Sequence, residues 1–304
     1  MRNFLKLRAA QLSLTTAVSL LLASGATTIT FDTALAEFEI QESQVEKGEI
    51  EFEYRGAVHS GFPRREREAA HEDEEGGVLE EEEEGEFLRQ SHDFEIQYGI
   101  TERWMISTTF ITDQPLHENY DLSGIELELQ YELIEREGNG IGLAFIGAYG
   151  FATRSKEADE IEFGPIMELA SGGFLLTTNT FFTSQVGDHR ETDGLGFEYG
   201  WRAQQKVAKK WSVGVEMFGE IEDLSHAGSF DDQQHSIGPS LFFTSGDDDD
   251  DNGGNGVDDD DGDDDERKVG GPPEIELSFN VGVQFGLTDV TSDTAVKFQG
   301  SLGF

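Results

Sequence analysis

Residues 125–133 read Ile-Glu-Leu-Glu-Leu-Gln-Tyr-Glu-Leu, with an apolar side chain at every second position. Successive side chains of a β-strand point to opposite faces of the sheet, so this alternation predicts a strand with one apolar and one polar face. The same pattern recurs from residue 48 to the end of the chain. Twelve segments carry it, near residues 48–58, 92–100, 104–112, 122–133, 141–151, 160–170, 174–183, 194–206, 211–220, 235–244, 274–286 and 294–304.

The connections between these segments alternate in length. Those at 101–103, 171–173 and 208–210 are short, whereas most of the others are long and polar. An even number of strands of about ten residues, joined alternately by short turns and long loops, is typical of a transmembrane β-barrel. We therefore predict an all-β fold, a transmembrane antiparallel up-and-down β-barrel of about 12 strands over residues 48–304.

Aromatic residues gather at both ends of the predicted strands. Trp104 and Trp211 follow short turns, while Phe110 and Phe163 lie toward the long loops. Two aromatic bands are the arrangement expected at the two interfaces of a membrane. A soluble β-sandwich is the alternative, but the single repeated hairpin pattern favours the barrel.

The end of the chain carries a more specific signal. Residues 296–304 read VKFQGSLGF, an alternating last strand with Phe304 at its terminus. This ending resembles the assembly signal of Gram-negative outer-membrane barrels. Together with GEIEFEY at 48–54, YGITERW at 98–104 and FGLT at 285–288, it resembles the barrel family named after the meta-pathway of phenol degradation, whose members are labelled transporters.

The resemblance covers roughly residues 48–304. It implies outer-membrane lipid and the barrel assembly machinery as partners, the latter through the C-terminal strand. It also implies passage of small aromatic or hydrophobic solutes. The chain departs from the family pattern by two acidic insertions, at 60–91 and 245–273.

Residues 1–36 have the features of a secretory signal peptide. A basic start with Arg2 and Lys6 precedes an apolar stretch at 12–23, and Ala-Leu-Ala at 34–36 forms a cleavage site. Export of a barrel through this signal predicts that the chain resides in the outer membrane of a Gram-negative bacterium.

Both termini are then expected in the periplasm. Residues 37–47 would form an N-terminal periplasmic segment, the short turns would face the periplasm, and the long loops would face outside. The acidic stretch at 60–91 becomes an outer loop. The Asp-rich insertion at 245–273 is expected to be disordered, because blocks of like charge repel one another.

Four residues of the Asp-rich insertion have the spacing of a calcium-binding loop. They are Asp248, Asp250, Asn252 and Asp259. Such a match arises easily inside a run of Asp, and no helices are expected on either side, so a solvated linker is the favoured interpretation. The sequence predicts no other cofactor, and it leaves open whether these residues bind Ca²⁺ weakly.

The polar face of each strand would line the lumen of the barrel. The charged residues predicted to line it are Glu51, Glu53, Arg55, Glu95, Glu126, Glu128, Glu132, Glu162, Glu168, Glu198, Arg202, Glu216 and Lys297. Only Arg55, Arg202 and Lys297 in this set are basic. We expect a hydrated lumen rather than a plugged one, because most of the acids would otherwise lack a partner.

A fixed negative field in a narrow lumen favours cations and neutral solutes over anions. We therefore predict a pore for the passive passage of small solutes, either cations or neutral and aromatic molecules. The alternative is a non-conducting barrel, structural or binding divalent cations, that acts through its acidic loops.

Other function classes are disfavoured. The chain has 63 acidic residues against 21 Lys and Arg, a formal charge of −42, which argues against a nucleic-acid partner. It has no Cys for thiol chemistry. Asp188, His189 and His226 lie in predicted outer loops, but no hydrolase motif accompanies them, so we expect no enzyme activity.

Overall fold

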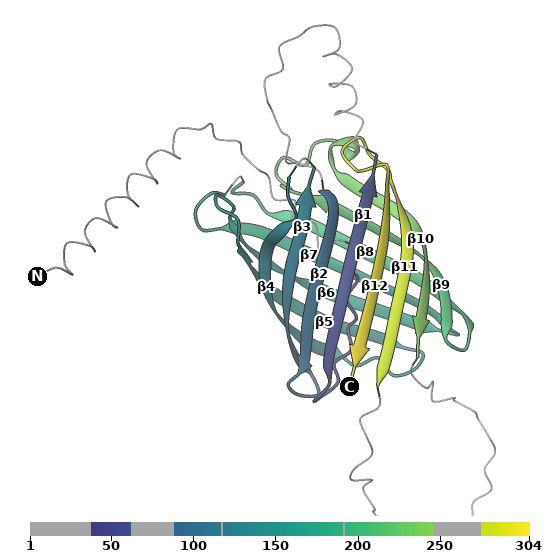
Figure 1. Cartoon of the computed structure of the whole chain (residues 1–304). Helices are drawn as coiled ribbons and strands as arrows, with labels where there is room; N and C mark the ends of the chain where they lie inside the picture. The colour runs from purple at the N-terminus through teal and green to yellow at the C-terminus, as the bar shows by residue number, and fades with distance from the viewer. Residues whose placement is uncertain (1–37, 62–87, 117, 191, 246–274) are drawn as a thin grey trace, which may run out of the picture.

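The computed structural model describes residues 38–61, 88–116, 118–190, 192–245 and 275–304 (Figure 1). They form a closed antiparallel barrel of twelve strands, in which each strand pairs with its neighbours in the chain and β1 pairs with β12. The strands are β1 (Ile50–Ser60), β2 (Leu88–Gly99), β3 (Trp104–Pro115), β4 (Asp121–Ile134), β5 (Ile141–Ala152), β6 (Asp159–Ser171), β7 (Phe174–Val186), β8 (Gly196–Ala208), β9 (Trp211–Ile221), β10 (Gln234–Thr244), β11 (Glu276–Gly286) and β12 (Thr294–Gly303).

The predicted fold is confirmed. Each of the twelve segments with alternating side chains is a strand, with ends within four residues of the expected ones. A single short 3₁₀-helix (Phe230–Asp232) accompanies the strands in the described ranges. No helix in those ranges is long and apolar enough to cross a membrane.

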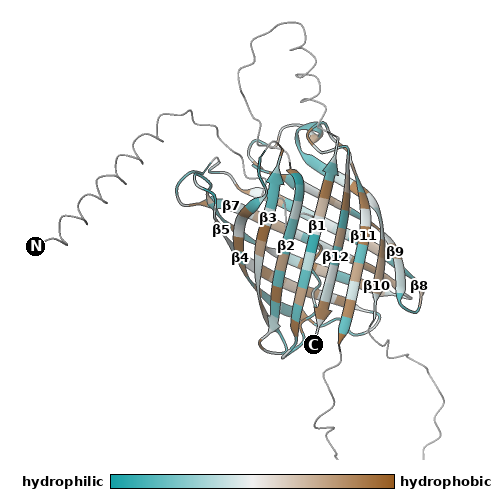
Figure 2. Cartoon of the chain, viewed as in Figure 1, coloured by the Kyte–Doolittle hydropathy of each residue, from teal (hydrophilic) through white to brown (hydrophobic). Residues whose placement is uncertain are grey.

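The two faces of the strands settle which side of the barrel is apolar. Leu127 and Leu129 of β4 are 44% and 43% exposed, whereas Glu128 between them is 3% exposed. Figure 2 shows the same alternation of brown and teal along the strands of the outer wall. A soluble sandwich buries its apolar face, but this barrel exposes it and buries the polar one. That arrangement suits a barrel surrounded by lipid.

The seam between the first and last strands is closed by the end of the chain. Phe304 and Ile50 exchange two backbone hydrogen bonds, of 3.0 and 3.1 Å between nitrogen and oxygen. The ring of Phe304 stacks on that of Phe52 at 5.9 Å between centroids. The residue expected to act as an assembly signal thus also completes the ladder in the folded barrel.

Residues 38–47, called the lumen segment below, lie inside the barrel. The C-terminal end of the segment leads into β1 at the short-turn end of the barrel, where the Gly48 amide donates to the Gly99 carbonyl. Its N-terminal end lies toward the long loops, where the ring of Phe38 stacks on that of His59 at 5.7 Å between centroids. The predicted periplasmic position of residues 37–47 is therefore wrong for the described part, because lumen-facing side chains hold that part by hydrogen bonds and ion pairs.

Candidate functional site

The lumen of the barrel is lined by charged and polar side chains. The structure places on its inner face every charged residue predicted there. Glu51, Glu53 and Glu126 are half-buried. The buried ones are Arg55, Glu95, Glu128, Glu132, Glu162, Glu168, Glu198, Arg202, Glu216 and Lys297.

Hydrogen bonds from strand side chains fix the middle of the lumen segment. The backbone N–H of Gln41 donates to Asn179 Oδ1 at 2.7 Å, and Asn179 Nδ2 donates back to the backbone carbonyl of Gln41 at 3.0 Å. Gln41 Nε2 donates to Glu128 at 2.7 Å, and Ser43 Oγ donates to Glu168 at 2.7 Å. These contacts replace the backbone ladder that a strand would use and hold the segment across the lumen.

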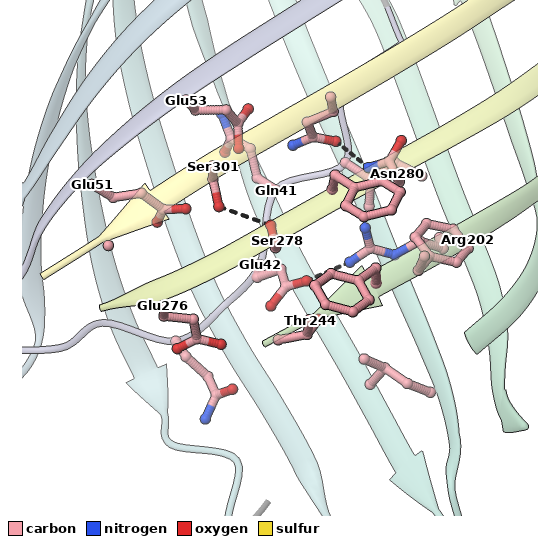
Figure 3. A pocket seen from close by; sticks show the side chains of 18 of the residues that line it. Gln41, Glu42, Glu51, Glu53, Arg202, Thr244, Glu276, Ser278, Asn280 and Ser301 are labelled. Carbon is pink, nitrogen blue, oxygen red and sulfur yellow. Dashed lines mark hydrogen bonds and ion pairs between the residues drawn. The ribbon is translucent and has the colours of Figure 1, made fainter. Parts of the chain in front are cut away.

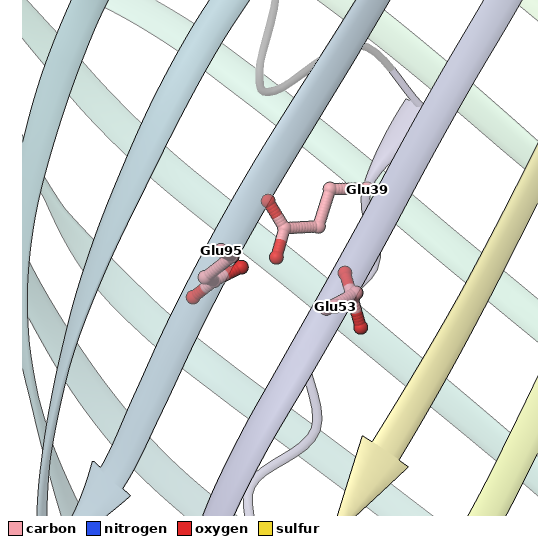
Figure 4. A group of neighbouring side chains, drawn as sticks. All are labelled: Glu39, Glu53 and Glu95. Carbon is pink, nitrogen blue, oxygen red and sulfur yellow. The ribbon is translucent and has the colours of Figure 1, made fainter.

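Arg55 forms the most densely charged contact of the lumen. Its buried guanidinium lies 2.8 Å from Glu39, 2.7 Å from Glu53 and 2.5 Å from Glu95, with Nη1 as the shared donor. Figure 4 shows these carboxylates meeting between the lumen segment, β1 and β2. Among the described residues, these three carboxylates lie close enough together to hold a metal ion. Arg55, however, already supplies the positive charge that they require.

The other two lumen cations contact the same segment. Arg202 Nη2 lies 2.5 Å from a Glu42 carboxylate oxygen, and its guanidinium lies over the ring of Phe242. Lys297 donates to the Phe38 carbonyl at 3.2 Å and pairs with Glu216 at 2.8 Å. All three basic residues predicted from the sequence to line the lumen therefore hold the lumen segment.

The opposite side of the lumen carries carboxylates on β4 and β6, of which Glu168 pairs with Arg136 at 3.1 Å. In the strand register Glu128 of β4 lies opposite Ala148 of β5, which in turn lies opposite Glu162 of β6. The small residue Ala148 thus lies between the two carboxylates in the register. The neighbouring positions are filled, however, because Ile146 packs with Phe181 in a buried apolar cluster.

Sequence reasoning missed the lumen segment and its contacts Gln41, Ser43 and Asn179. A signal was present, because Phe38 and Ile40 alternate with Glu39 and Gln41 directly before the first strand. Sequence reasoning also missed Ile146, which is fully buried on β5. The acidic loop residues 62–87 and the calcium-loop residues Asp248, Asp250, Asn252 and Asp259 lie outside the described residues.

A cavity of about 540 Å³ lies beside the lumen segment at the short-turn end (Figure 3). Strands β1 and β8 to β12 contribute to its wall. Glu95 of β2 and Glu128 of β4 also line it, so the cavity reaches the acidic side of the lumen. The cavity is the part of the lumen that a small solute could enter from the short-turn end.

His226 lies in a long loop and contacts a carboxylate and a hydroxyl. Its Nδ1 atom is 2.9 Å from Asp223 Oδ2 and 2.9 Å from Ser225 Oγ. A nucleophile relay needs the two partners on different ring nitrogens. Here both contact the same nitrogen within one exposed turn, and the hydrogen bonds from Ser225 and His226 hold the pKa of Asp223 below its usual range. This geometry is that of a loop-stabilising turn.

No protein-family model matches the chain, and no curated protein matches it in sequence. Its fold is similar to solved outer-membrane barrels. An outer-membrane channel from Pseudomonas putida F1 matches with a TM-score of 0.50 at 8% identity, over 88% of this chain and 100% of that one. The KdgM porin matches with a TM-score of 0.43 at 7% identity, over 84% and 98%. The NanC porin matches with 0.45 at 7% identity, over 83% and 98%.

Proposed function

We propose that this chain is a narrow outer-membrane pore for small solutes, in which the lumen segment restricts passage. The observation that carries this proposal is the closed barrel with an apolar outer face and a charged, polar lumen. The short turns and the C-terminus would lie in the periplasm, and the long loops would face outside. The shared fold with the channel from Pseudomonas putida F1 supports an outer-membrane location.

Solutes would diffuse down their gradient through the space beside the lumen segment. The chemical selectivity would come from the fixed charges of the wall. Glu168 of β6 pairs with Arg136. Glu128 of β4 and Glu162 of β6 form no ion pair with a described residue, so their field would repel anions and favour cations or dipolar neutral solutes. The finer assignment of aromatic solutes rests on the family resemblance.

Neutralising the acidic wall is expected to weaken the preference for cations. Glu126→Gln combined with Glu128→Gln removes two carboxylates that face the lumen, so the reversal potential in a salt gradient should move toward zero. The measurement is a planar-bilayer recording of the refolded mature chain. Glu135→Gln with Glu137→Gln makes the same charge change in an exposed turn and should leave the reversal potential nearly unchanged. If the variant with Glu126→Gln and Glu128→Gln keeps its selectivity, these carboxylates do not lie on the conduction path.

A non-conducting barrel is the second candidate function. The observation that favours it is the lumen segment itself, which Arg55, Arg202 and Lys297 hold in place. The same recordings separate the two functions. A barrel that is folded, as judged by heat-dependent gel mobility, but shows no discrete current steps would point to the structural role, or to the capture of divalent cations by the acidic loops. Discrete steps would support the pore.

A further inference from the structure

We infer that the cavity at the short-turn end binds a linear diammonium solute, a chain that carries one ammonium group at each end. This inference rests on the proposed pore and names the class of solute that the short-turn half of its lumen would hold. Two observations carry it. The cavity wall has an excess of carboxylates, and it contains buried hydrogen-bond acceptors that no described residue satisfies.

Glutamates outnumber basic residues on the cavity wall. Nine glutamates line the cavity against five Arg and Lys residues. The two arginines are already paired, Arg202 with Glu42 at 2.5 Å and Arg136 with Glu168 at 3.1 Å. The three lysines are exposed at the short-turn end: Lys206, Lys209 and Lys210. The wall therefore keeps a net negative charge, and such a field favours a cationic solute.

Most of these carboxylates are not neutralised by the barrel. Arg55 and Arg202 hold four of the nine. The other five form no ion pair with a described residue: Glu46, Glu49, Glu51, Glu128 and Glu276. Glu128 lies on β4, whereas Glu51 and Glu276 lie on β1 and β11 at the short-turn end. The unneutralised charge thus occupies two separate parts of the wall.

Glu49, Glu51 and Glu276, called the mouth carboxylates below, gather around Gly303 of β12. Gly303 lies opposite Glu51 on one side and opposite Glu276 on the other, and Figure 3 shows these two side chains on the same side of the cavity. A Cβ atom on Gly303 would lie 2.5 Å from Glu49 Oε1. Burial raises the pKa of Glu49 above its usual value, and the charges of Glu46 and Glu276 raise it further. A bound ammonium group would relieve this repulsion.

The second part of the wall is a set of buried acceptors around Glu128. Gln41 Nε2 donates to Glu128 Oε2 at 2.7 Å, and Gln130 Nε2 donates to the Glu42 carbonyl at 3.1 Å. The remaining oxygens, Gln41 Oε1, Glu128 Oε1 and Gln130 Oε1, accept no hydrogen bond from any described residue. Glu128 is 3% exposed and Gln130 is 1% exposed. An ammonium group has three N–H donors, which these three inner acceptors lack.

The unpaired atoms of the cavity call for a donor rather than an acceptor. Asn280 Oδ1 is a fourth buried acceptor without a described partner, and Arg202 Nε is the unpaired donor among the described residues that line the cavity. Buried polar groups in folded proteins are nearly always satisfied, by the protein, by water or by a ligand. A ligand with ammonium groups fits this surplus of acceptors, and a carboxylate ligand does not.

The space between the two parts of the wall suits a methylene chain. Strands β2 and β3 separate β1 from β4 in the barrel. Met105 of β3 and Ile40 of the lumen segment line the cavity and give it an apolar surface. The volume of about 540 Å³ is within the usual range for small-molecule sites. A short chain could therefore place one ammonium at the mouth carboxylates and the other at the inner acceptors.

The spacing of the carboxylates argues against a metal ion as the occupant. Among the described residues, the carboxylates close enough together to chelate a metal are Glu39, Glu53 and Glu95, and these already contact Arg55. The mouth carboxylates and Glu128 do not belong to that group. Separated carboxylates match two charges at the ends of a chain better than one compact divalent charge.

The test is calorimetry on the refolded mature chain in detergent with linear diamines from 1,3-diaminopropane to 1,6-diaminohexane, each compared with the monoamine of the same length. We expect at least one diamine to bind about tenfold or more tightly than its monoamine, because the second ammonium adds a charge-assisted contact. Glu128→Gln and Glu276→Gln should each weaken the binding of that diamine about tenfold, to the level of the monoamine.

A matched control makes the same charge change away from the cavity. Glu137→Gln, in an exposed turn, should leave the affinities for the diamine and the monoamine unchanged. Heat-dependent gel mobility shows which variants are folded. Glu276 is exposed at the end of β11, so its substitution tests the site even if Glu128→Gln does not fold.

Several outcomes would overturn the inference. They are equal binding of every diamine and its monoamine, no binding of any probe to the folded barrel, and tighter binding of Ca²⁺ than of every diamine. The proposed pore fails separately. Selective diamine binding without bilayer conductance would overturn the pore and leave the binding site, whereas cation-selective conductance without selective diamine binding would leave the pore and overturn the site.

Discussion

Removing residues 38–47 is expected to raise the single-channel conductance of the barrel several-fold. The lumen segment crosses the interior and is held by Arg55, Arg202 and Lys297. Without it, the lumen of a twelve-stranded barrel is wider than the eight-stranded kind that its own side chains fill, so ions gain a continuous aqueous path. Planar-bilayer recordings of the refolded deletion variant beside the mature chain give the comparison.

Two further variants show whether the gain comes from the opened lumen. Gln41→Ala with Ser43→Ala removes two side-chain hydrogen bonds to the wall but keeps the segment, and should increase current fluctuations with a smaller rise in mean conductance. Gln44→Ala removes two hydrogen bonds to Arg136 and should change little, because Arg136 keeps its ion pair with Glu168. The deletion variant must retain heat-dependent gel mobility. If it does, and its conductance equals that of the mature chain, the segment does not limit ion flow.

Replacing Arg55 by Met is expected to destabilise the folded barrel by about 3–5 kcal/mol. The guanidinium is buried and contacts carboxylates from the lumen segment, β1 and β2. Removing it leaves these buried carboxylates to repel one another in a region of low dielectric constant, where such a charge is costly. Urea-induced unfolding in lipid vesicles, followed by tryptophan fluorescence, measures the loss.

A charge-matched background separates this electrostatic effect from lost packing. In the triple variant Glu39→Gln, Glu53→Gln and Glu95→Gln, the repulsion is gone, and Arg55→Met should then cost much less. Lys209→Met, in an exposed turn, should shift the stability by no more than about 0.5 kcal/mol. An equally large loss in both backgrounds would mean that Arg55 stabilises the barrel mainly by packing.

The barrel wall is predictable because its information is local. Residues 125–133 assign each side chain to one face through a period of two, and neighbouring strands are joined by short turns or loops of their own. Orientation of Glu128 toward the lumen and Leu127 toward lipid follows from that periodicity alone. The number of strands follows from counting the repeats.

The contents of the lumen are not predictable in this way. Lys297 meets the Phe38 carbonyl across 259 positions of sequence, and Gln41 meets Asn179 across 138. Periodicity says which face a side chain occupies but not which distant group fills the space in front of it. The excess of lumen acids over bases therefore suggested water. The folded chain also brings its own segment to Arg55, Arg202 and Lys297, because closing the barrel places β1, β8 and β12 around one interior that the segment enters from the short-turn end.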